Sequence, residues 1–244
     1  MLNLIDLLVG AVSTNDLLKA GPIGACLLAA WVAGRTVEES SRLRRRLLLV
    51  IMAAGCAVAT TKLASRWIAY PRPFVLTQNA YRLSGDQLVS YPKAELRTPG
   101  APDSEERMTN LSKGIVGSND WESFPSDHAG FFGCLALGLF WVHRRIGAVA
   151  LGWTLFVILG GKWLRGLHRP ADLLAGLAIA LIFLLLWRLL DRFAWLDRIG
   201  QWTVRQNAWA TALLFFVAVE ITSTLDHLQD AALSARTILR AFIQ

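Results

Sequence analysis

Six long apolar runs are the feature that most limits what this chain can fold into. They cover residues 17–34, 47–69, 125–142, 146–164, 171–190 and 207–225. Of the 244 residues, 54% are hydrophobic and only 18% are charged, whereas a soluble domain is usually about 25% charged. The uncharged core of each run is shorter than the roughly 20 residues that span a bilayer, so one run alone also fits a buried soluble helix. Six such runs, flanked by arginine or tryptophan, predict a membrane protein instead.

The predicted fold is all-α: a polytopic membrane helix bundle of about six transmembrane helices, forming a single membrane domain over residues 1–244. Residues 1–15 place apolar side chains at helical spacing, which predicts an N-terminal amphipathic helix in the membrane interface. Arginines gather between runs one and two, three and four, and five and six, so the positive-inside rule makes these connections cytoplasmic. The segment 74–124, between transmembrane helices two and three, is then extracytoplasmic, and its length and polarity predict a lid.

The net charge of +7 raises the question of a nucleic-acid surface. The basic residues are scattered through three short loops, where they set membrane orientation, and they form no continuous patch. We therefore expect membrane lipids as partners and no nucleic acid. The sequence leaves the oligomeric state open.

Three polar clusters interrupt the apolar pattern, at 62–73, 123–128 and 162–172. Counting the membrane crossings places all three on the same, outer face. Together they hold two histidines, several cations and two helix N-termini, and cations and free backbone N–H groups stabilise phosphoryl oxygens. One histidine could attack phosphorus while the other protonates the leaving oxygen. The clusters therefore predict a site for a phosphorylated ligand.

The clusters also resemble three motifs of a known family. The sequence offers Arg72-Pro73, then Pro125-Ser126-Asp127-His128, then Lys162, His168 and Asp172. These are similar to the motifs KxxxxxxRP, PSGH and SRxxxxxHxxxD of the membrane phosphatidic acid phosphatase type 2 superfamily. Within it, the Pro-Arg-Pro-Phe and Ser-Phe-Pro-Ser-Asp-His forms are most similar to the undecaprenyl pyrophosphate phosphatases.

The resemblance implies a role for each matching residue. His168 would be the nucleophile that forms a phosphohistidine, Asp172 would hold its ring, and His128 would be the general acid. The implied phosphate-binding groups are Arg72, Lys162, and the backbone and hydroxyl of Ser126. The mechanism that the resemblance implies uses no metal and no cofactor.

The first motif departs from the family pattern. Counting back from Arg72, the position of the family lysine is occupied by Ser65. Lys62 lies one turn earlier on the same helix face, and Arg66 is adjacent, so either could supply the missing charge to the phosphate. Both could also extend to the membrane surface with no role in the site.

The other two motifs depart as well. Lys162, preceded by Gly161, stands where the family has arginine, and lysine gives a point charge in place of a planar fork. Asp127 replaces a glycine, and a carboxylate facing a phosphate would repel it. We therefore expect the Asp127 side chain to point away while its N–H contributes to phosphate binding. Asp172 could serve only to cap its helix, and His128 could be an ordinary interfacial histidine.

We expect an integral membrane lipid phosphatase, in the inner membrane of a bacterium, with its active site facing the periplasm. Its expected substrate is a lipid pyrophosphate or phosphomonoester, undecaprenyl pyrophosphate above all, which would place it in cell wall biogenesis. A lipid phosphotransferase using the same phosphohistidine is an alternative. A degenerate relative that binds or transports lipid phosphate without turnover is another, suggested by Ser65, Gly161 and Lys162.

Overall fold

The computed structural model of the chain describes residues 15–68, 70, 72–73, 81–84, 87–90, 122–164 and 166–222. Its helices are α2 (Asp16–Val32), α3 (Val37–Ile68), α6 (Asp127–Val142), α7 (Arg144–Gly152), α8 (Gly160–Leu164), α9 (Pro170–Leu190), α10 (Trp195–Arg205) and α11 (Asn207–Thr222). A π-helical segment, η2 (Trp153–Leu159), joins α7 to α8. The three form one continuous helix of 21 residues.

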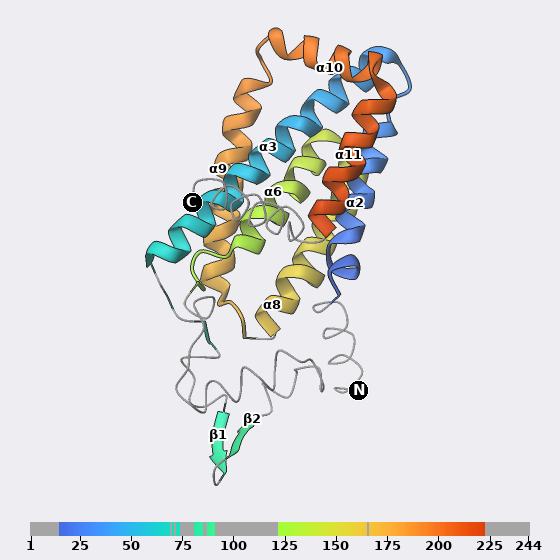
Figure 1. The fold of residues 1–244 in the computed structure, drawn as a ribbon. Helices are drawn as coiled ribbons and strands as arrows, with labels where there is room; N and C mark the ends of the chain where they lie inside the picture. Colours follow the sequence, from blue (N-terminus) through green and yellow to red (C-terminus); the bar gives the residue numbers. More distant parts are fainter. Residues whose placement is uncertain are drawn as a thin grey trace, which may run out of the picture.

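The helices confirm an all-α membrane bundle. Each of the six apolar runs overlaps one of these helices, when α7, η2 and α8 are taken together. Three helices are long and apolar enough to cross a membrane, namely α3, the α7–α8 helix and α9, and three shorter apolar segments lie in α2, α6 and α11. Figure 1 shows these helices side by side, with α10 lying across one end of the bundle. The N-terminal interfacial helix is predicted for a segment of which residues 1–14 lie outside the described part.

The core of the bundle surrounds α6, which packs against α3, α7 and α9. Large side chains fill this core, among them Leu47 and Val50 of α3 and Phe132, Leu135 and Leu139 of α6, all nearly or fully buried. The outward faces of α9 and α11 are apolar as well, with many leucine and phenylalanine side chains exposed. Exposed apolar faces of this extent fit a lipid surrounding, so the packing agrees with the membrane assignment.

Two features near residues 37–46 and 195–205 differ from the sequence interpretation. The helix α3 begins at Val37, ten residues before its apolar run, because Glu38 and Glu39 suit a helix N-terminus. Arg44, interpreted as a loop residue, is therefore helical and buried; its guanidinium donates hydrogen bonds to the carbonyl of Thr203 at 2.9 Å and to Asn207 Oδ1 at 2.7 Å.

The segment between α9 and α11, interpreted as an arginine-rich loop, contains the helix α10. Trp195 and Trp202 are exposed on this helix, whereas Leu196, Gly200 and Thr203 are buried against the bundle. Such an amphipathic helix with exposed tryptophans suits a membrane surface.

One short hairpin lies within the segment predicted to be a lid. Its strands are β1 (Tyr81–Ser84) and β2 (Gln87–Ser90), paired antiparallel with Tyr81 opposite Ser90 and Ser84 opposite Gln87. The remainder of 74–121 lies outside the described residues, so the lid stays a prediction.

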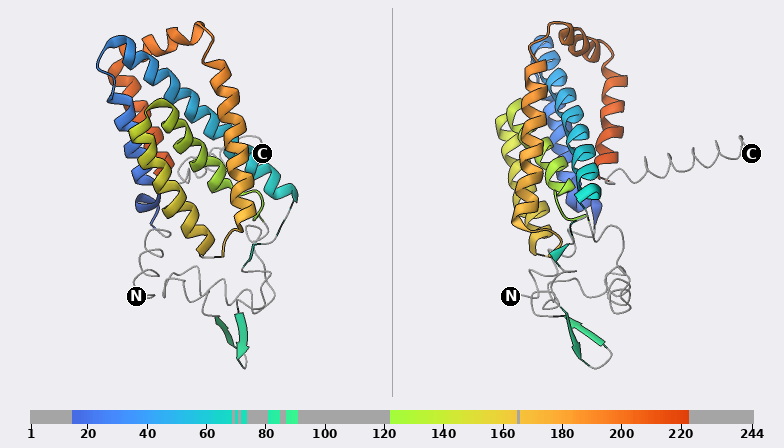
Figure 2. Two further views of the ribbon diagram at one scale, coloured as in Figure 1. Left: turned by 180° about the vertical axis from the view of Figure 1, so that it is seen from behind. Right: turned by 90° about the vertical axis from the view of Figure 1, so that its left-hand side faces the viewer.

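The two ends of the bundle differ in their polar residues. The arginine end carries the start of α3, the start of α7, the end of α9, and α10; the site end carries the end of α3 and the starts of α6 and α9 (Figures 1 and 2). The three polar clusters therefore meet at one end, as the count of crossings predicts. The arginine-rich segments lie at the other end.

Candidate active site

The turn before His168 is shaped by glycine. Gly166 has φ +64°, a left-handed conformation that favours glycine. Its N–H donates to the carbonyl of Trp163 at 2.9 Å, and the N–H of Leu167 donates to the carbonyl of Lys162 at 3.0 Å. This pair of bonds is a Schellman motif, which ends α8 abruptly. The chain then reverses and places His168 immediately before α9.

Asp172 fixes the start of α9. Pro170 opens this helix, and the Asp172 carboxylate accepts a hydrogen bond from the backbone N–H of Arg169 at 2.8 Å. The same oxygen accepts a hydrogen bond from the Ser123 hydroxyl at 2.6 Å. Asp172 thus caps its helix, and its carboxylate also joins the second polar cluster to the third.

The starts of α6 and α9 approach each other closely because one residue has no side chain. A Cβ on Gly176 would lie 2.4 Å from the carbonyl oxygen of Ser126, closer than real contacts allow. At this crossing the backbone N–H of Ser126 donates to the carbonyl of Asp172 at 3.0 Å, and the Ser126 hydroxyl accepts from Ala129 N. Ser126 was expected to offer both groups to phosphate. The backbone N–H is therefore engaged within the protein, whereas the hydroxyl only accepts here and keeps its own hydrogen to donate. Phosphate binding by Ser126 stays a prediction.

His168 is almost completely buried, with only 1% of its surface exposed. Its Nδ1 lies 2.9 Å from the carbonyl oxygen of Ser123. A carbonyl can only accept, so the neutral ring carries its proton on Nδ1 and its lone pair on Nε2. Nε2 is buried and has no hydrogen-bond partner among the described residues. A buried nitrogen left without a partner costs free energy, which suggests that this atom has a chemical role.

The surroundings keep His168 neutral. Burial is the main reason why its pKa falls from the ordinary 6.5 to about 3. The charges of Arg72, His128 and Lys162 also lower this pKa, while Asp127 opposes them. A neutral imidazole with a free lone pair, surrounded by cations, can attack an anionic phosphoryl group.

Asp127 lies between a cation and the second histidine. Its Oδ2 lies 2.9 Å from Nζ of Lys62, and its Oδ1 lies 2.7 Å from Nδ1 of His128. The expectation that its side chain points away is wrong, because these two partners hold the carboxylate inside the cluster. Because Nδ1 of His128 contacts Asp127 Oδ1, it is the other ring nitrogen, Nε2, that can exchange a proton with a ligand.

The structure distinguishes the residues that could replace the family lysine in the first motif. Ser65, at the family's lysine position, is buried and donates its hydroxyl to the carbonyl of Lys62 at 3.0 Å. Arg66 is exposed and pairs with Glu122 at 3.3 Å. Of Lys62 and Arg66, it is therefore Lys62 that contacts the histidine cluster, through Asp127.

Arg169 ties the first cluster to the third. Its guanidinium donates to the hydroxyl of Tyr70 at 2.6 Å and lies 5.2 Å from the centre of that ring. The backbone carbonyl of Tyr70 in turn accepts from the N–H of Ser123 at 3.0 Å. Arg165, the next basic residue after Lys162, lies outside the described residues.

Two residues of the site escaped the sequence interpretation. Ser123 acts through its backbone carbonyl, which every residue type has, so no sequence signal marks this contact. Lys19 of α2 is buried, and its charge acts on His128. It is a cation within an apolar helix, and in a membrane segment that is a signal of function.

Donor atoms of Asp127, His128 and His168 lie within 4.8 Å of one another, a spacing that could hold a metal ion. The Asp127 carboxylate is already bound by Lys62 and His128, and Arg72 and Lys162 act on His168 from nearby. Cations in these positions disfavour a divalent metal and favour an anion. The donor set therefore suits a phosphate better than a metal.

The polar clusters, their order and their meeting at one end of a membrane bundle agree with one comparison with known proteins. Searches of curated proteins and of solved structures find no match. The family model described as the PAP2 superfamily matches residues 44–196, which is more than half of the chain and includes most of α3, all of α6 and α9, and all three clusters. Membership of this superfamily supports a phosphatase-type phosphoesterase in a membrane bundle. The chain belongs to the PAP2 superfamily.

Proposed function

We propose that this protein is an integral membrane lipid phosphatase that works through a phosphohistidine on His168. The observation that carries the proposal is Nε2 of His168, a buried nitrogen that has no hydrogen-bond partner among the described residues, in a neutral ring surrounded by cations. Phosphoryl transfer requires positioning and charge stabilisation above all. Arg72 and Lys162 supply positive charge at this point of the site.

The first half of the reaction transfers the phosphoryl group to the enzyme. The Nε2 lone pair of His168 attacks phosphorus, and the bond from phosphorus to the leaving oxygen breaks. His128 gives its proton to that oxygen. The leaving group is then the lipid alcohol if the substrate is a phosphomonoester, or the protonated lipid monophosphate if it is a pyrophosphate. The Nδ1–H group of His168 stays bonded to the Ser123 carbonyl, which keeps the ring in its orientation during the attack.

The second half releases phosphate. His128, now neutral, takes a proton from water while the water oxygen attacks the phosphohistidine. The P–N bond breaks, the electron pair returns to Nε2, and inorganic phosphate leaves. Both histidines then have their starting protonation, so the cycle is balanced without an external reagent.

The substrate is proposed to be a lipid, because the site lies at one end of a bundle whose outer faces are apolar. A headgroup could reach the clusters while its tail remains in the bilayer. Among lipid phosphates we propose undecaprenyl pyrophosphate, on the likeness of the Pro-Arg-Pro-Phe and Ser-Phe-Pro-Ser-Asp-His segments to phosphatases of that lipid. A role in cell wall biogenesis follows from this substrate.

The proposal is tested by assaying the purified protein against undecaprenyl pyrophosphate, phosphatidylglycerol phosphate, phosphatidic acid and lipid A. We expect inorganic phosphate to be released fastest from undecaprenyl pyrophosphate. A phosphorylated lipid acceptor appearing in place of free phosphate would make the protein a phosphotransferase. Retention of radiolabelled lipid without turnover would make it a binding relative.

We further propose that the site end faces the outside of a bacterial inner membrane, because the arginine end should face the cytoplasm. The test is cysteine labelling in intact cells, with Cys26, Cys56 and Cys134 replaced by alanine. A membrane-impermeant maleimide should label Ala171→Cys at the site end and leave Arg145→Cys unlabelled. The reverse pattern would overturn the orientation.

A further inference from the structure

A polar cavity lies at the arginine end, away from the candidate active site. It has a volume of about 440 Å³ and is lined by residues of α3, α6 and α9 and the turn that follows α9: Arg46, Trp141, Leu185, Arg188, Leu189, Asp191 and Arg192. Arg46 and Lys62 are sixteen residues apart on α3, about 24 Å at 1.5 Å per residue. The catalytic groups therefore do not reach this cavity.

The charges of the cavity are not balanced. Among the described residues, one carboxylate lines it, that of Asp191, which is held by Arg46 at 2.9 Å and by Arg45 at 2.8 Å. Arg188 and Arg192 are exposed and form no ion pair with a carboxylate among the described residues. Two guanidinium groups thus remain for an anion, each with a planar set of donors suited to phosphate oxygens.

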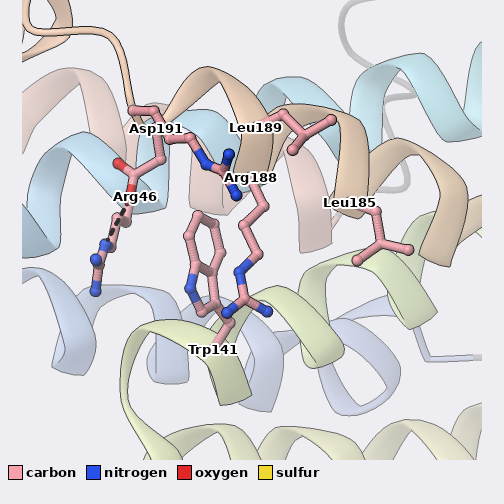
Figure 3. Close-up of a pocket in the computed structure, with 7 residues that line it drawn as sticks. Arg46, Trp141, Leu185, Arg188, Leu189 and Asp191 are labelled. Carbon is pink, nitrogen blue, oxygen red and sulfur yellow. Dashed lines mark hydrogen bonds and ion pairs between the residues drawn. The ribbon is translucent and has the colours of Figure 1, made fainter.

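Trp141 orders one wall of the cavity. The guanidinium groups of Arg46 and Arg188 lie 5.4 Å and 5.9 Å from the centre of its ring, and Figure 3 shows the indole between these two arginines. Cation–π contacts of this kind restrict where the arginine side chains can go. The site is therefore partly preorganised before any ligand binds.

An apolar stripe leads away from the cavity along α9. Leu185 and Leu189 line the cavity itself, and 49% and 52% of their surfaces are exposed. Leu181 is exposed one turn further towards the bilayer centre, and the i, i+4, i+8 spacing places the three leucines on one face. A ligand with an anionic head and an apolar tail would match both parts.

We propose that this cavity binds the phosphodiester headgroup of an anionic phospholipid, with an acyl chain lying along Leu181, Leu185 and Leu189. Basic pockets between transmembrane helices at a membrane surface recognise such headgroups. The lipid would join the end of α9 to α3 and α6 and so stabilise the bundle. This binding is independent of the proposed phosphatase activity.

The test uses the purified full chain in neutral detergent and measures its melting temperature during titration with lipid. Phosphatidylglycerol should raise the melting temperature saturably, whereas phosphatidylcholine, which has no net charge, should not. Any response to inorganic phosphate should come from the candidate active site and so be unchanged in the Arg188→Gln/Arg192→Gln variant. The Arg188→Gln/Arg192→Gln variant should bind phosphatidylglycerol at least about tenfold more weakly, the loss expected for a charge-assisted hydrogen bond. Each single variant should show part of that loss, which keeps the test valid if the double variant does not fold.

The matched control is Arg144→Gln/Arg145→Gln, which removes two exposed arginines from the same end of the bundle. It should keep the full response to phosphatidylglycerol. If phosphatidylglycerol raised the melting temperature of Arg188→Gln/Arg192→Gln as much as that of the parent protein, the proposal would be overturned. The two arginines would then act only on the C-terminal helix dipole and on membrane orientation. A response to inorganic phosphate that equals the response to phosphatidylglycerol and is lost in Arg188→Gln/Arg192→Gln would assign the cavity to a free anion and also overturn the lipid assignment.

Discussion

Nδ1 of His168 lies 2.9 Å from the carbonyl oxygen of Ser123 and 3.9 Å from Asp172 Oδ2. The backbone carbonyl is therefore the direct partner of the proposed nucleophile. Asp172 acts one step further away, because its carboxylate holds the Ser123 hydroxyl at 2.6 Å. Ser123 joins the carboxylate to the imidazole and is a positioning residue in this arrangement.

The first prediction concerns that link. Ser123→Ala keeps the carbonyl but removes the hydroxyl that anchors it to Asp172. A hydrogen bond to a charged group contributes about 1.5–3 kcal/mol, so we expect kcat to fall by about tenfold or more while KM changes little. Ser123→Thr, which keeps a hydroxyl, should recover part of the rate. A change confined to KM would contradict the positioning role.

The second prediction concerns Asp127 and the leaving group. Asp127→Asn should weaken the orientation of His128, and general acid catalysis contributes about 10²–10⁴-fold. Hydrolysis of a lipid phosphate, whose leaving oxygen needs a proton, should slow by at least about tenfold. Hydrolysis of a p-nitrophenyl phosphate, whose leaving group needs little protonation, should slow much less. Equal losses on both substrates would show that Asp127 does not act through His128.

The third prediction concerns the pair formed by Lys62 and Asp127. Lys62→Met leaves the Asp127 carboxylate without its cation, next to the phosphate, so the negative charge should repel the substrate. Removing the carboxylate as well, in Lys62→Met/Asp127→Gly, should restore part of the affinity, because contacting residues are not additive. The control is Arg66→Met, which removes an exposed cation paired with Glu122 and should have a smaller effect. Additive losses for Lys62 and Asp127 would contradict the pairing.

The fourth prediction concerns pH. The pKa of His168 is lowered to about 3, so the folded ring stays neutral where the unfolded ring, with a pKa near 6.5, takes up a proton. This difference contributes stability above pH 6.5 that is lost progressively as the pH falls towards 3. The melting temperature of the parent protein should therefore fall more steeply between pH 6.5 and 4 than that of His168→Gln. Parallel curves for the two proteins would refute the assignment.

The fifth prediction concerns the buried Arg44. Its guanidinium joins α3 to Thr203 and Asn207, so Arg44→Leu should lower the melting temperature, since it removes this donor from the buried carbonyl of Thr203 and breaks the bond to Asn207. Turnover of the protein that remains folded should be unchanged, because Arg44 lies at the arginine end. Arg42→Leu, at an exposed position of the same helix, is the control and should melt close to the parent.

The sequence was sufficient to predict the bundle and the meeting of the three clusters. Because charged residues separate the apolar runs at only a few places, counting the membrane crossings predicts which polar segments lie at the same end of the bundle. It was not sufficient for α10, because four arginines between apolar runs resemble a loop until the tryptophan spacing is read as one helix face. The carbonyl contact of Ser123 could not be predicted at all, since a backbone oxygen has no residue type.

The pairing of Lys62 with Asp127 shows a different limit. Each residue is a visible departure from the family motifs, but the two belong to α3 and α6 and are sixty-five residues apart in sequence. Only the packing of these helices shows that the two departures contact each other. The carboxylate of Asp127 would repel a phosphate on its own, but Lys62 neutralises its charge. The two departures from the family motifs therefore compensate each other.

The central claim is that His168 carries the phosphoryl group during turnover. The most direct measurement is rapid quenching of the purified protein with a ³²P-labelled lipid pyrophosphate, followed by mapping of the label. We predict an acid-labile, base-stable label on His168, absent from His168→Ala, whose turnover should be lower by at least about a thousandfold. Label on another residue, or phosphate release by His168→Ala at the parent rate, would contradict the account.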